Sequence, residues 1–158
     1  MSAEPLSPVE RTEKLARLHQ AFTAFVPHNK ALGLLFEDFG EGEASLRLPW
    51  REDLVGNPAT QALHGGALTT LLDATLGAAV FLRTWEPKPI ATLDLRIDFM
   101  KPAVPRRDLI AKAVCYAMRR NVAFVRGIAF HDESDPIATA AATFMLDTRG
   151  KSALSRAK

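Results

Sequence analysis

The feature that most constrains the fold is a long apolar segment, residues 67–82, near the middle of the 158-residue chain. It predicts one helix that is apolar around almost its whole circumference, and such a helix is normally buried in a core. Other elements must therefore surround it. Two glycines, Gly65 and Gly66, open this helix, and one carboxylate, Asp73, lies in its middle.

The rest of the chain supplies strands that can cover this helix. Residues 32–39 and 43–50 flank a Gly40-Glu41-Gly42 turn and predict a hairpin. After the helix come four strand-like runs, at residues 90–100, 109–118, 122–131 and 136–147. Short links between the late strands favour antiparallel pairing. We expect an α+β fold in which a curled antiparallel sheet of about six strands wraps one long central helix.

Two further patterns complete the predicted organisation. Residues 8–26 carry apolar side chains at helical spacing and predict an amphipathic N-terminal helix, which Pro27-His28-Asn29 ends. In the strand at 90–100 apolar and charged residues alternate, which places one set of four on a single face: Leu93, Leu95, Ile97 and Phe99. We expect an N-terminal helical extension over residues 1–31, one domain over 32–148, and a flexible basic tail over 149–158.

Composition excludes some classes of function and partner. With 47% apolar and 24% charged residues, the chain has an ordinary globular composition. A net charge of +2 gives no electrostatic case for nucleic acid or a membrane surface as a partner. A single cysteine, Cys115, excludes an internal disulfide and favours the cytoplasm, and the first residues lack the order of a signal peptide.

A membrane span over residues 62–82 is the alternative to a core helix. The run is about long enough to cross a bilayer. Asp73 at mid-bilayer would cost roughly 2.5–3.5 kcal/mol on insertion scales. The predicted strands also need this helix to cover them, so we expect no membrane span.

The start of the helix has the parts of an acyl-transfer site. The first four N–H groups of a helix lack partners inside it, and the helix dipole favours negative charge there. An N–H at a thioester carbonyl stabilises the developing charge, and losing one such donor typically costs about 3–4 kcal/mol. Asp73 would then act on water. The alternative is that Gly65 and Gly66 only permit a tight turn.

Asp73 shares a helix face with small and polar residues, because residues three and four apart are neighbours. That stripe comprises Thr69, Thr70, Asp73 and Gly77. Gly77 would leave room beside the acid for a ligand or a second backbone. The alternative reading is a core aspartate that accepts a hydrogen bond from a threonine hydroxyl or from Arg96.

The segment before the helix contributes three more candidates. His64 would hold the loop, polarise a water or cap the helix. Asn57 and Gln61 are neutral hydrogen-bonding residues that would orient a water or the acyl carbonyl. Alternatively, both are simply turn residues around Pro58.

Other chemistries find no support in the sequence. The four histidines have no metal-ligand spacing and no cysteine partner. There is no Gly-x-Ser-x-Gly elbow for a serine nucleophile and no phosphate-binding glycine loop or dinucleotide fingerprint. Cys115 falls within a predicted strand, where burial is its expected role.

Two segments carry a resemblance to a known family. They are Leu63-His64-Gly65-Gly66, with an acid nine residues after the histidine, and the strand Ala91-Thr92-Leu93-Asp94-Leu95-Arg96-Ile97-Asp98-Phe99-Met100-Lys101-Pro102. Both resemble the hot-dog fold acyl-CoA thioesterases of the phenylacetate-degradation (PaaI-like) branch. The similarity extends over residues 32–146 and agrees with the order of elements predicted above.

The resemblance implies a dimer, often a dimer of dimers, with active sites at the interface. It implies that Asp73 is the general base or nucleophile. The backbone N–H of Gly65 from the other subunit would polarise the thioester carbonyl. Asn57 resembles a loop asparagine of the family, although it lies seven residues before His64, whereas some relatives have it six before.

At Gly77 some members of the family carry Ser or Thr, so a hydroxyl from Thr69 or Thr70 would have to substitute. The phosphates of CoA need cations near the mouth of the site, and the candidates are Lys101, Arg119 and Arg120. The alternative for each is solvated surface charge.

The expected activity is hydrolysis of an acyl-CoA to a free acid and CoA, with no metal and no cofactor other than the CoA of the substrate. Two alternatives stay open. One is a hydratase or dehydratase on the same fold, which would need a histidine base beside the carbonyl donor. The other is an acyl-CoA binding module without catalysis, against which the cost of a buried acid beside a bound acyl chain argues.

Overall fold

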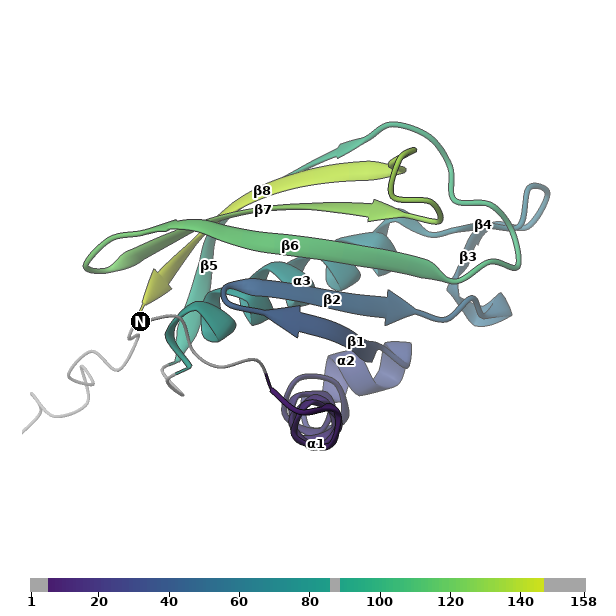
Figure 1. Ribbon diagram of the computed structural model, residues 1–158. Helices are drawn as coiled ribbons and strands as arrows, with labels where there is room; N and C mark the ends of the chain where they lie inside the picture. Colours follow the sequence, from purple (N-terminus) through teal and green to yellow (C-terminus); the bar gives the residue numbers. More distant parts are fainter. Residues whose placement is uncertain (1–5, 86–88, 147–158) are drawn as a thin grey trace, which may run out of the picture.

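The computed structural model describes residues 6–85 and 89–146 (Figure 1). The predicted tail at 149–158 and the predicted domain end at 148 lie outside these residues. The elements, in chain order, are α1 (Pro8–His19), the π-helix η1 (Gln20–Ala24), α2 (Pro27–Leu32), β1 (Leu35–Gly40), β2 (Glu43–Leu48), the 3-10 helix η2 (Glu52–Leu54), β3 (Val55–Asn57), β4 (Ala62–Leu63), α3 (Gly65–Thr84), β5 (Ile90–Phe99), β6 (Leu109–Met118), β7 (Val122–Phe130) and β8 (Ala138–Leu146).

The predicted six-stranded antiparallel sheet around one long helix is confirmed. The strand order is β1-β2-β6-β7-β8-β5, and every neighbouring pair is antiparallel. The strands arch over α3, which lies against their inner face (Figure 1). β3 and β4 form a separate two-stranded sheet just before α3.

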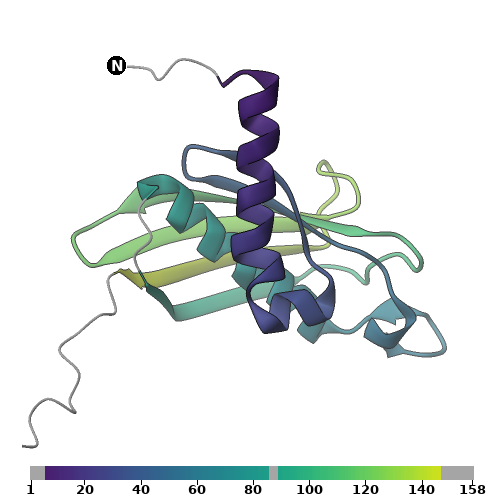
Figure 2. The ribbon, with the colours of Figure 1, turned by 90° about the horizontal axis from the view of Figure 1, so that it is seen from below.

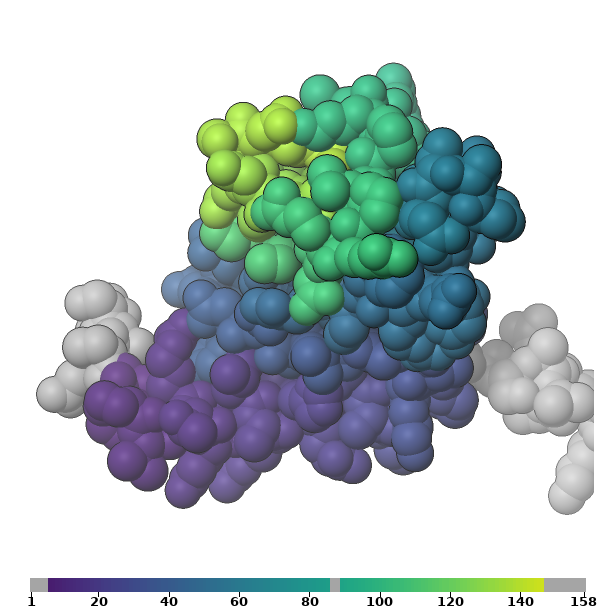
Figure 3. All heavy atoms as spheres, turned by 90° about the vertical axis from the view of Figure 1, so that its right-hand side faces the viewer, coloured from purple at the N-terminus to yellow at the C-terminus, as the bar shows by residue number. Residues whose placement is uncertain are grey.

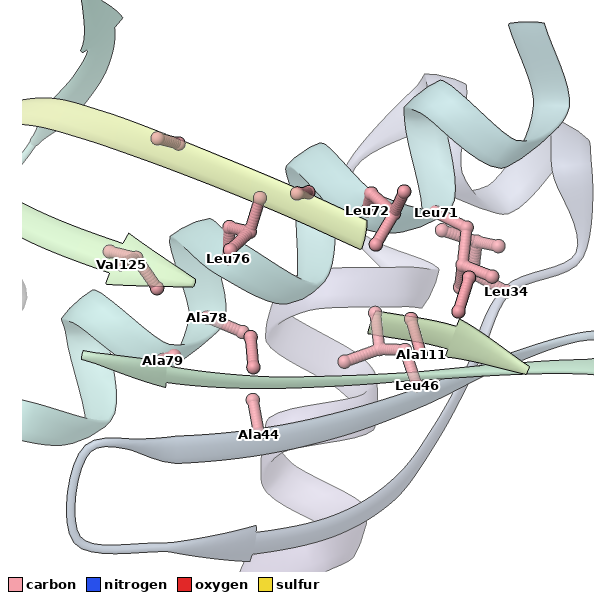
Figure 4. Close-up of a cluster of buried hydrophobic side chains, with 14 of the residues drawn as sticks. Leu34, Ala44, Leu46, Leu71, Leu72, Leu76, Ala78, Ala79, Ala111 and Val125 are labelled. Atoms are coloured by element: carbon pink, nitrogen blue, oxygen red, sulfur yellow. The ribbon is translucent and has the colours of Figure 1, made fainter. Parts of the chain in front are cut away.

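The core lies between α3 and the inner face of the sheet. Leucines of α3 are fully buried among side chains from β2, β6 and β7 (Figure 4). On the other side of α3, the ring of Phe22 from η1 packs edge-on against Phe81 at 5.2 Å. By length and hydropathy α3 would suffice to cross a bilayer. Its burial between the sheet and the N-terminal helices accounts for its apolar character instead.

The predicted N-terminal helix over residues 8–26 is confirmed over residues 8–24, although its last five residues are π-helical. The helix changes to π geometry at Gln20, where the buried Thr23 hydroxyl donates to His19 O at 2.6 Å. Pro27 then begins a second helix rather than ending the first, because proline is well suited to the first helical position. The predicted strand start at residue 32 is also wrong, since Leu32 is the last residue of α2.

The predicted alternation in β5 is wrong in part, because the strand contains a β-bulge. Thr92 pairs with Phe144 and Asp94 pairs with Thr143, so Leu93 is the extra residue. The bulge reverses which residues face α3. Leu95 and Ile97 pack against the core, but Leu93 is 51% exposed.

A first prediction concerns the close packing of β7 against β6. A Cβ on Gly127 would lie 2.7 Å from the backbone oxygen of Lys112. Gly127→Ala should therefore lower the free energy of unfolding by about 1–3 kcal/mol, the usual cost of overpacking, as measured by urea denaturation. Gly77→Ala is the matched control, because the nearest atoms to a Cβ there are side-chain carbons at 3.6 Å. Equal stability of the two variants would contradict this account.

Candidate active site at the start of α3

His64 caps the first turn of α3. It has extended backbone dihedrals, and its Nδ1 accepts a hydrogen bond from the Gly66 N–H at 2.9 Å. Nδ1 must therefore carry a lone pair. A Cβ on residue 66 would lie 2.9 Å from this same nitrogen, so only glycine allows the histidine to approach so closely. Of the roles predicted for His64, the structure places it as a cap.

Gly65 supplies an N–H that is free to bind a ligand. Within the described residues, no acceptor takes a hydrogen bond from this N–H. The residue is exposed, and the nearest side chain to a Cβ built on it would be the ring of Phe99 at 3.6 Å. The group therefore lies at the positive end of the α3 dipole, where it can stabilise an anionic oxygen.

Asp73 is half-buried and is braced by the edge strand. The hydroxyl of Thr92 donates to Asp73 Oδ1 at 3.0 Å. This contact depends on the bulge at Leu93, which turns Thr92 toward α3. Arg96 instead donates to Asp98 at 3.1 Å, so its suggested role as partner of Asp73 is wrong.

The sequence reasoning missed Thr92, although it named a threonine hydroxyl as one partner for the acid. A threonine among apolar and charged residues in the strand that follows the helix was the available signal. Simple alternation placed it on the outer face, because a bulge leaves no mark in the spacing of side chains.

The other members of the predicted stripe serve α3 itself. Thr69 and Thr70 donate to the carbonyl oxygens of Gly65 and Gly66 at 3.0 and 3.1 Å. Neither threonine bonds Asp73. Gly77 is buried against Ile90 and Phe144, so it does not leave open space beside the acid.

The segment before α3 forms a turn in which some of the polar side-chain groups hydrogen-bond to the turn's own backbone. Asn57 Oδ1 accepts from the Ala59 N–H at 3.0 Å, and Gln61 Nε2 donates to Pro58 O at 2.9 Å. Gln61 has a positive φ of 58°. A substrate could therefore hydrogen-bond to the other amide atom of each side chain, which is Nδ2 of Asn57 and Oε1 of Gln61.

The predicted phosphate-binding cations fall at two different ends of the molecule. Lys101 lies in the connection at 100–108, which borders the β3–β4 hairpin at the end of the molecule where α3 begins (Figure 3). It pairs with Asp135. Arg119 and Arg120 lie in the β6–β7 turn, at the opposite end of the sheet (Figure 1).

The two main catalytic candidates, the Gly65 N–H and the Asp73 carboxylate, lie far apart within one chain. Asp73 follows Gly65 by eight residues along the helix, which is about 12 Å at 1.5 Å per residue. One thioester carbonyl cannot touch both groups of the same chain. If they act together, the carbonyl donor and the acid come from two copies.

Cys115 is unsuited to the role of nucleophile. It is a buried free thiol, and burial raises its pKa above the ordinary value. The thiol therefore stays protonated at neutral pH, whereas the thiolate is the nucleophilic form. In the part of the chain that the structure describes, no cluster of three His, Cys, Asp or Glu side chains is arranged to hold a metal ion.

Comparison with known families identifies the superfamily of the chain. The model of the thioesterase superfamily matches residues 60–138, which contain α3, Asp73 and the bulged strand β5. The chain belongs to the thioesterase superfamily. The matched range begins just before the His64 cap and ends within the first residues of β8.

Two relatives are similar in sequence. A protein of Halobacterium salinarum, named as a candidate esterase, is 42% identical over 87 residues, which are 52% of this chain and 55% of the relative. The chain therefore spans about half the length of that relative. The medium/long-chain acyl-CoA thioesterase YigI of Escherichia coli is 28% identical over 147 residues, covering 85% of this chain and 94% of YigI.

Solved structures share the fold. A Pseudomonas aeruginosa protein is 39% identical, with a TM-score of 0.75 over 83% of this chain and 98% of that one. A mutant of the phenylacetic acid degradation protein PaaI from Thermus thermophilus is 27% identical, with a TM-score of 0.66 over 75% of this chain and 97% of that one. The superfamily member described here is a PaaI-like hot-dog thioesterase.

A second prediction tests the brace on Asp73. Thr92→Val keeps the shape of the side chain but removes the hydroxyl that donates to Asp73 Oδ1. A hydrogen bond to a charged group is worth about 1.5–3 kcal/mol, so we expect thioester turnover to fall by about tenfold or more. Thr92→Ser keeps the donor and should retain most of the activity. Release of free thiol measures both variants, and equal activity of Thr92→Val and wild type would exclude this role.

Proposed function

We propose that the protein hydrolyses an acyl-CoA to a free carboxylic acid and CoA, at a site shared by two copies of the chain. One observation carries the proposal. The half-buried Asp73, braced by Thr92, and the uncommitted N–H of Gly65 both lie beside β5, the edge strand of the sheet. The relationship to thioesterases supports the reaction class. The name of YigI suggests the acyl-CoA substrate.

Each group would have one task in the reaction. The thioester carbonyl oxygen accepts a hydrogen bond from the Gly65 N–H, which stabilises negative charge as the carbonyl is attacked. Asp73 accepts a proton from the attacking water while Thr92 holds its Oδ1. The tetrahedral intermediate then expels the CoA sulfur, which takes that proton back from Asp73. Direct attack by Asp73, followed by hydrolysis of the anhydride, is the alternative order and uses the same residues.

The exposed edge of the sheet supports a dimer. β5 is ten residues long and pairs with β8 on one side, and among residues 6–85 and 89–146 no strand pairs with its other side. Leu93 and Phe99 on this strand are 51% and 53% exposed. A long edge strand with exposed apolar side chains favours pairing with another chain. A second copy of β5 is the partner that we propose.

Antiparallel pairing of two β5 strands would assemble the site. Thr92 lies beside Asp73 toward the start of the strand, and Phe99 lies beside Gly65 at its end. A two-fold axis through the middle of β5 reverses the second strand. It brings the Asp73 end of one copy to the partner subunit's Gly65. The distance of about 12 Å between these groups in one chain is then no obstacle.

The accessory roles predicted from sequence belong to the same proposal. Asn57 and Gln61 would orient the water or the carbonyl through the amide groups that their turn leaves available. Lys101, Arg119 and Arg120 stay predictions as contacts of the CoA phosphates. We propose a reaction without metal or added cofactor, a cytoplasmic location and a dimer that pairs into a dimer of dimers.

A third prediction tests the acid. Asp73→Asn keeps the size of the side chain and a group that can accept from Thr92, but removes the proton acceptor. We expect a folded protein with turnover lower by at least about a hundredfold, the usual scale of a lost general base. Free-thiol release from purified protein with a panel of acyl-CoAs gives the readout. Unchanged hydrolysis would remove Asp73 from the mechanism.

A fourth prediction tests whether the site is shared. Gly65→Pro replaces the N–H by a ring carbon, and the backbone accepts the change because proline fits the first helical position and His64 already has the extended dihedrals that precede proline. This variant and Asp73→Asn should each be nearly inactive alone. Refolded together, they should recover about a quarter of wild-type activity, because half of the random two-fold dimers are mixed and each has one intact site.

Gly65→Ala is the matched control for that experiment, since it keeps the N–H and should stay active. Absence of any recovery in the mixture, with both variants folded and dimeric, would contradict a shared site. Mass spectrometry of the products from an enoyl-CoA, together with the thiol assay, separates the alternative functions. Water addition to an enoyl-CoA without release of thiol indicates a hydratase, and binding of acyl-CoA without thiol release indicates a non-catalytic module.

A further inference from the structure

Residues 25–28, which join η1 to α2 and include the first two residues of α2, contact the helix that carries the proposed acid; we call them the N-terminal corner. His28 Nε2 is 3.1 Å from the hydroxyl oxygen of Thr70. Because the proton of that hydroxyl is donated to Gly66 O, the His28 Nε2–H must be the donor in this contact. Thr70 precedes Asp73 by three residues on the same face of α3. The corner is therefore tied to α3 within one turn of Asp73.

The N-terminal corner is anchored on both sides. Before it, the ring of Phe22 packs against Phe36 and Phe81 with centroids 6.0 and 5.2 Å apart. After it, the buried Asn29 donates through Nδ2 to Phe22 O at 2.7 Å and accepts from the Leu34 N–H at 3.1 Å. These contacts hold the backbone of the corner in one position relative to α3.

The anchored corner nevertheless presents an exposed aromatic ring. Phe25 is 79% exposed, the largest fraction for any large apolar side chain in the described part of the chain. Aromatic rings bury large apolar areas when they are covered and contribute strongly to binding. A fixed backbone carrying an open phenyl ring is suited to contact an apolar ligand without a large ordering cost.

The exposed surface of α3 leads from the acid to this corner. Its open residues lie in the first half of the helix and again in the last turn, and the six residues between Ala74 and Phe81 are buried. This stretch runs between β5 on one side and α2 on the other (Figures 1 and 2). Ile90 and Phe144 close it at Gly77. Of the neighbours of Asp73 on its helix face, Gly77 is therefore covered, whereas Thr70 lies beside α2, where His28 contacts it.

We propose that Phe25 is a specificity-determining residue that contacts the acyl chain of the substrate, and that His28 is a positioning residue that holds the corner through Thr70. The inference rests on the proposed acyl-CoA hydrolysis and adds the side on which the acyl chain lies. It also explains why the N-terminal helices end over the first half of α3 (Figure 2). The ligand is an aliphatic chain long enough to reach the corner.

The test compares kcat/KM for butanoyl-, octanoyl- and dodecanoyl-CoA. Phe25→Ala should lower the value for dodecanoyl-CoA by about tenfold, within the range for losing apolar contact with a substrate, and leave butanoyl-CoA nearly unchanged. Phe25→Trp should move the preference to shorter chains. Val9→Ala is the matched control, because Val9 is an exposed apolar residue at the far end of α1 (68% exposed) and should leave the chain-length profile unchanged.

His28→Ala should change the chain-length profile in the direction of Phe25→Ala, mainly through KM. His28→Gln keeps an N–H donor and should restore the wild-type profile. A merely structural role would instead lower activity equally for every chain length. Equal effects of Phe25→Ala on all three substrates would overturn the proposal.

Dissociation of the Phe25→Ala dimer in analytical ultracentrifugation would also overturn the proposal, since the ring would then cover a second copy of the chain. These results differ from failure of the proposed function, in which wild-type protein releases no thiol from any acyl-CoA. If wild-type protein releases no thiol, both the proposed function and the role of Phe25 are excluded. If the Phe25 variants are active but affect all chain lengths equally, only the role of Phe25 is excluded.

Discussion

A single sheet covers α3 from one side only, and this incomplete burial of an apolar helix underlies the rest of the structure. The second half of α3 is enclosed by the sheet and by Phe22 from the N-terminal segment. Its first half keeps a partly open stripe that includes Asp73. The proposed catalytic groups therefore lie on the part of α3 that the sheet and the N-terminal helices leave partly exposed. A carboxylate in that stripe avoids the cost of full burial without a partner.

The edge of the sheet determines how that stripe is used. The bulge at Leu93 turns Thr92 toward Asp73 and moves an apolar side chain to the exposed face. No strand in the described part of the chain pairs with the outer side of this strand, and an unpaired edge is a liability for a monomer. Pairing with a second copy would satisfy the backbone groups of that edge and bring the partner subunit's Gly65 to Asp73. In the proposed dimer, one edge then serves both assembly and catalysis.

Much of the fold could be predicted from periodicity. The apolar segment after Gly66 predicted the central helix, and alternation with short turns predicted six antiparallel strands. The N-terminal segment was predicted less well. Phe25 has the spacing of a continuing amphipathic helix, but the backbone changes course at Gln20 and leaves the ring exposed. Packing of Thr23 and Asn29 against their surroundings decides that change, and side-chain spacing does not record it.

For the site, the sequence by itself determined which groups are available: an acid in an apolar helix, two glycines at its start and a histidine before them. Those assignments follow from residue type and from the unpaired N–H groups of any helix start. Only the tertiary structure decided which groups meet. It assigned the Gly66 N–H to His64, left that of Gly65 uncommitted, and placed Thr92 rather than Thr69, Thr70 or Arg96 on Asp73. The reason is that these contacts depend on strand register and a bulge, which arise from pairing between β5 and β8 and not from either segment alone.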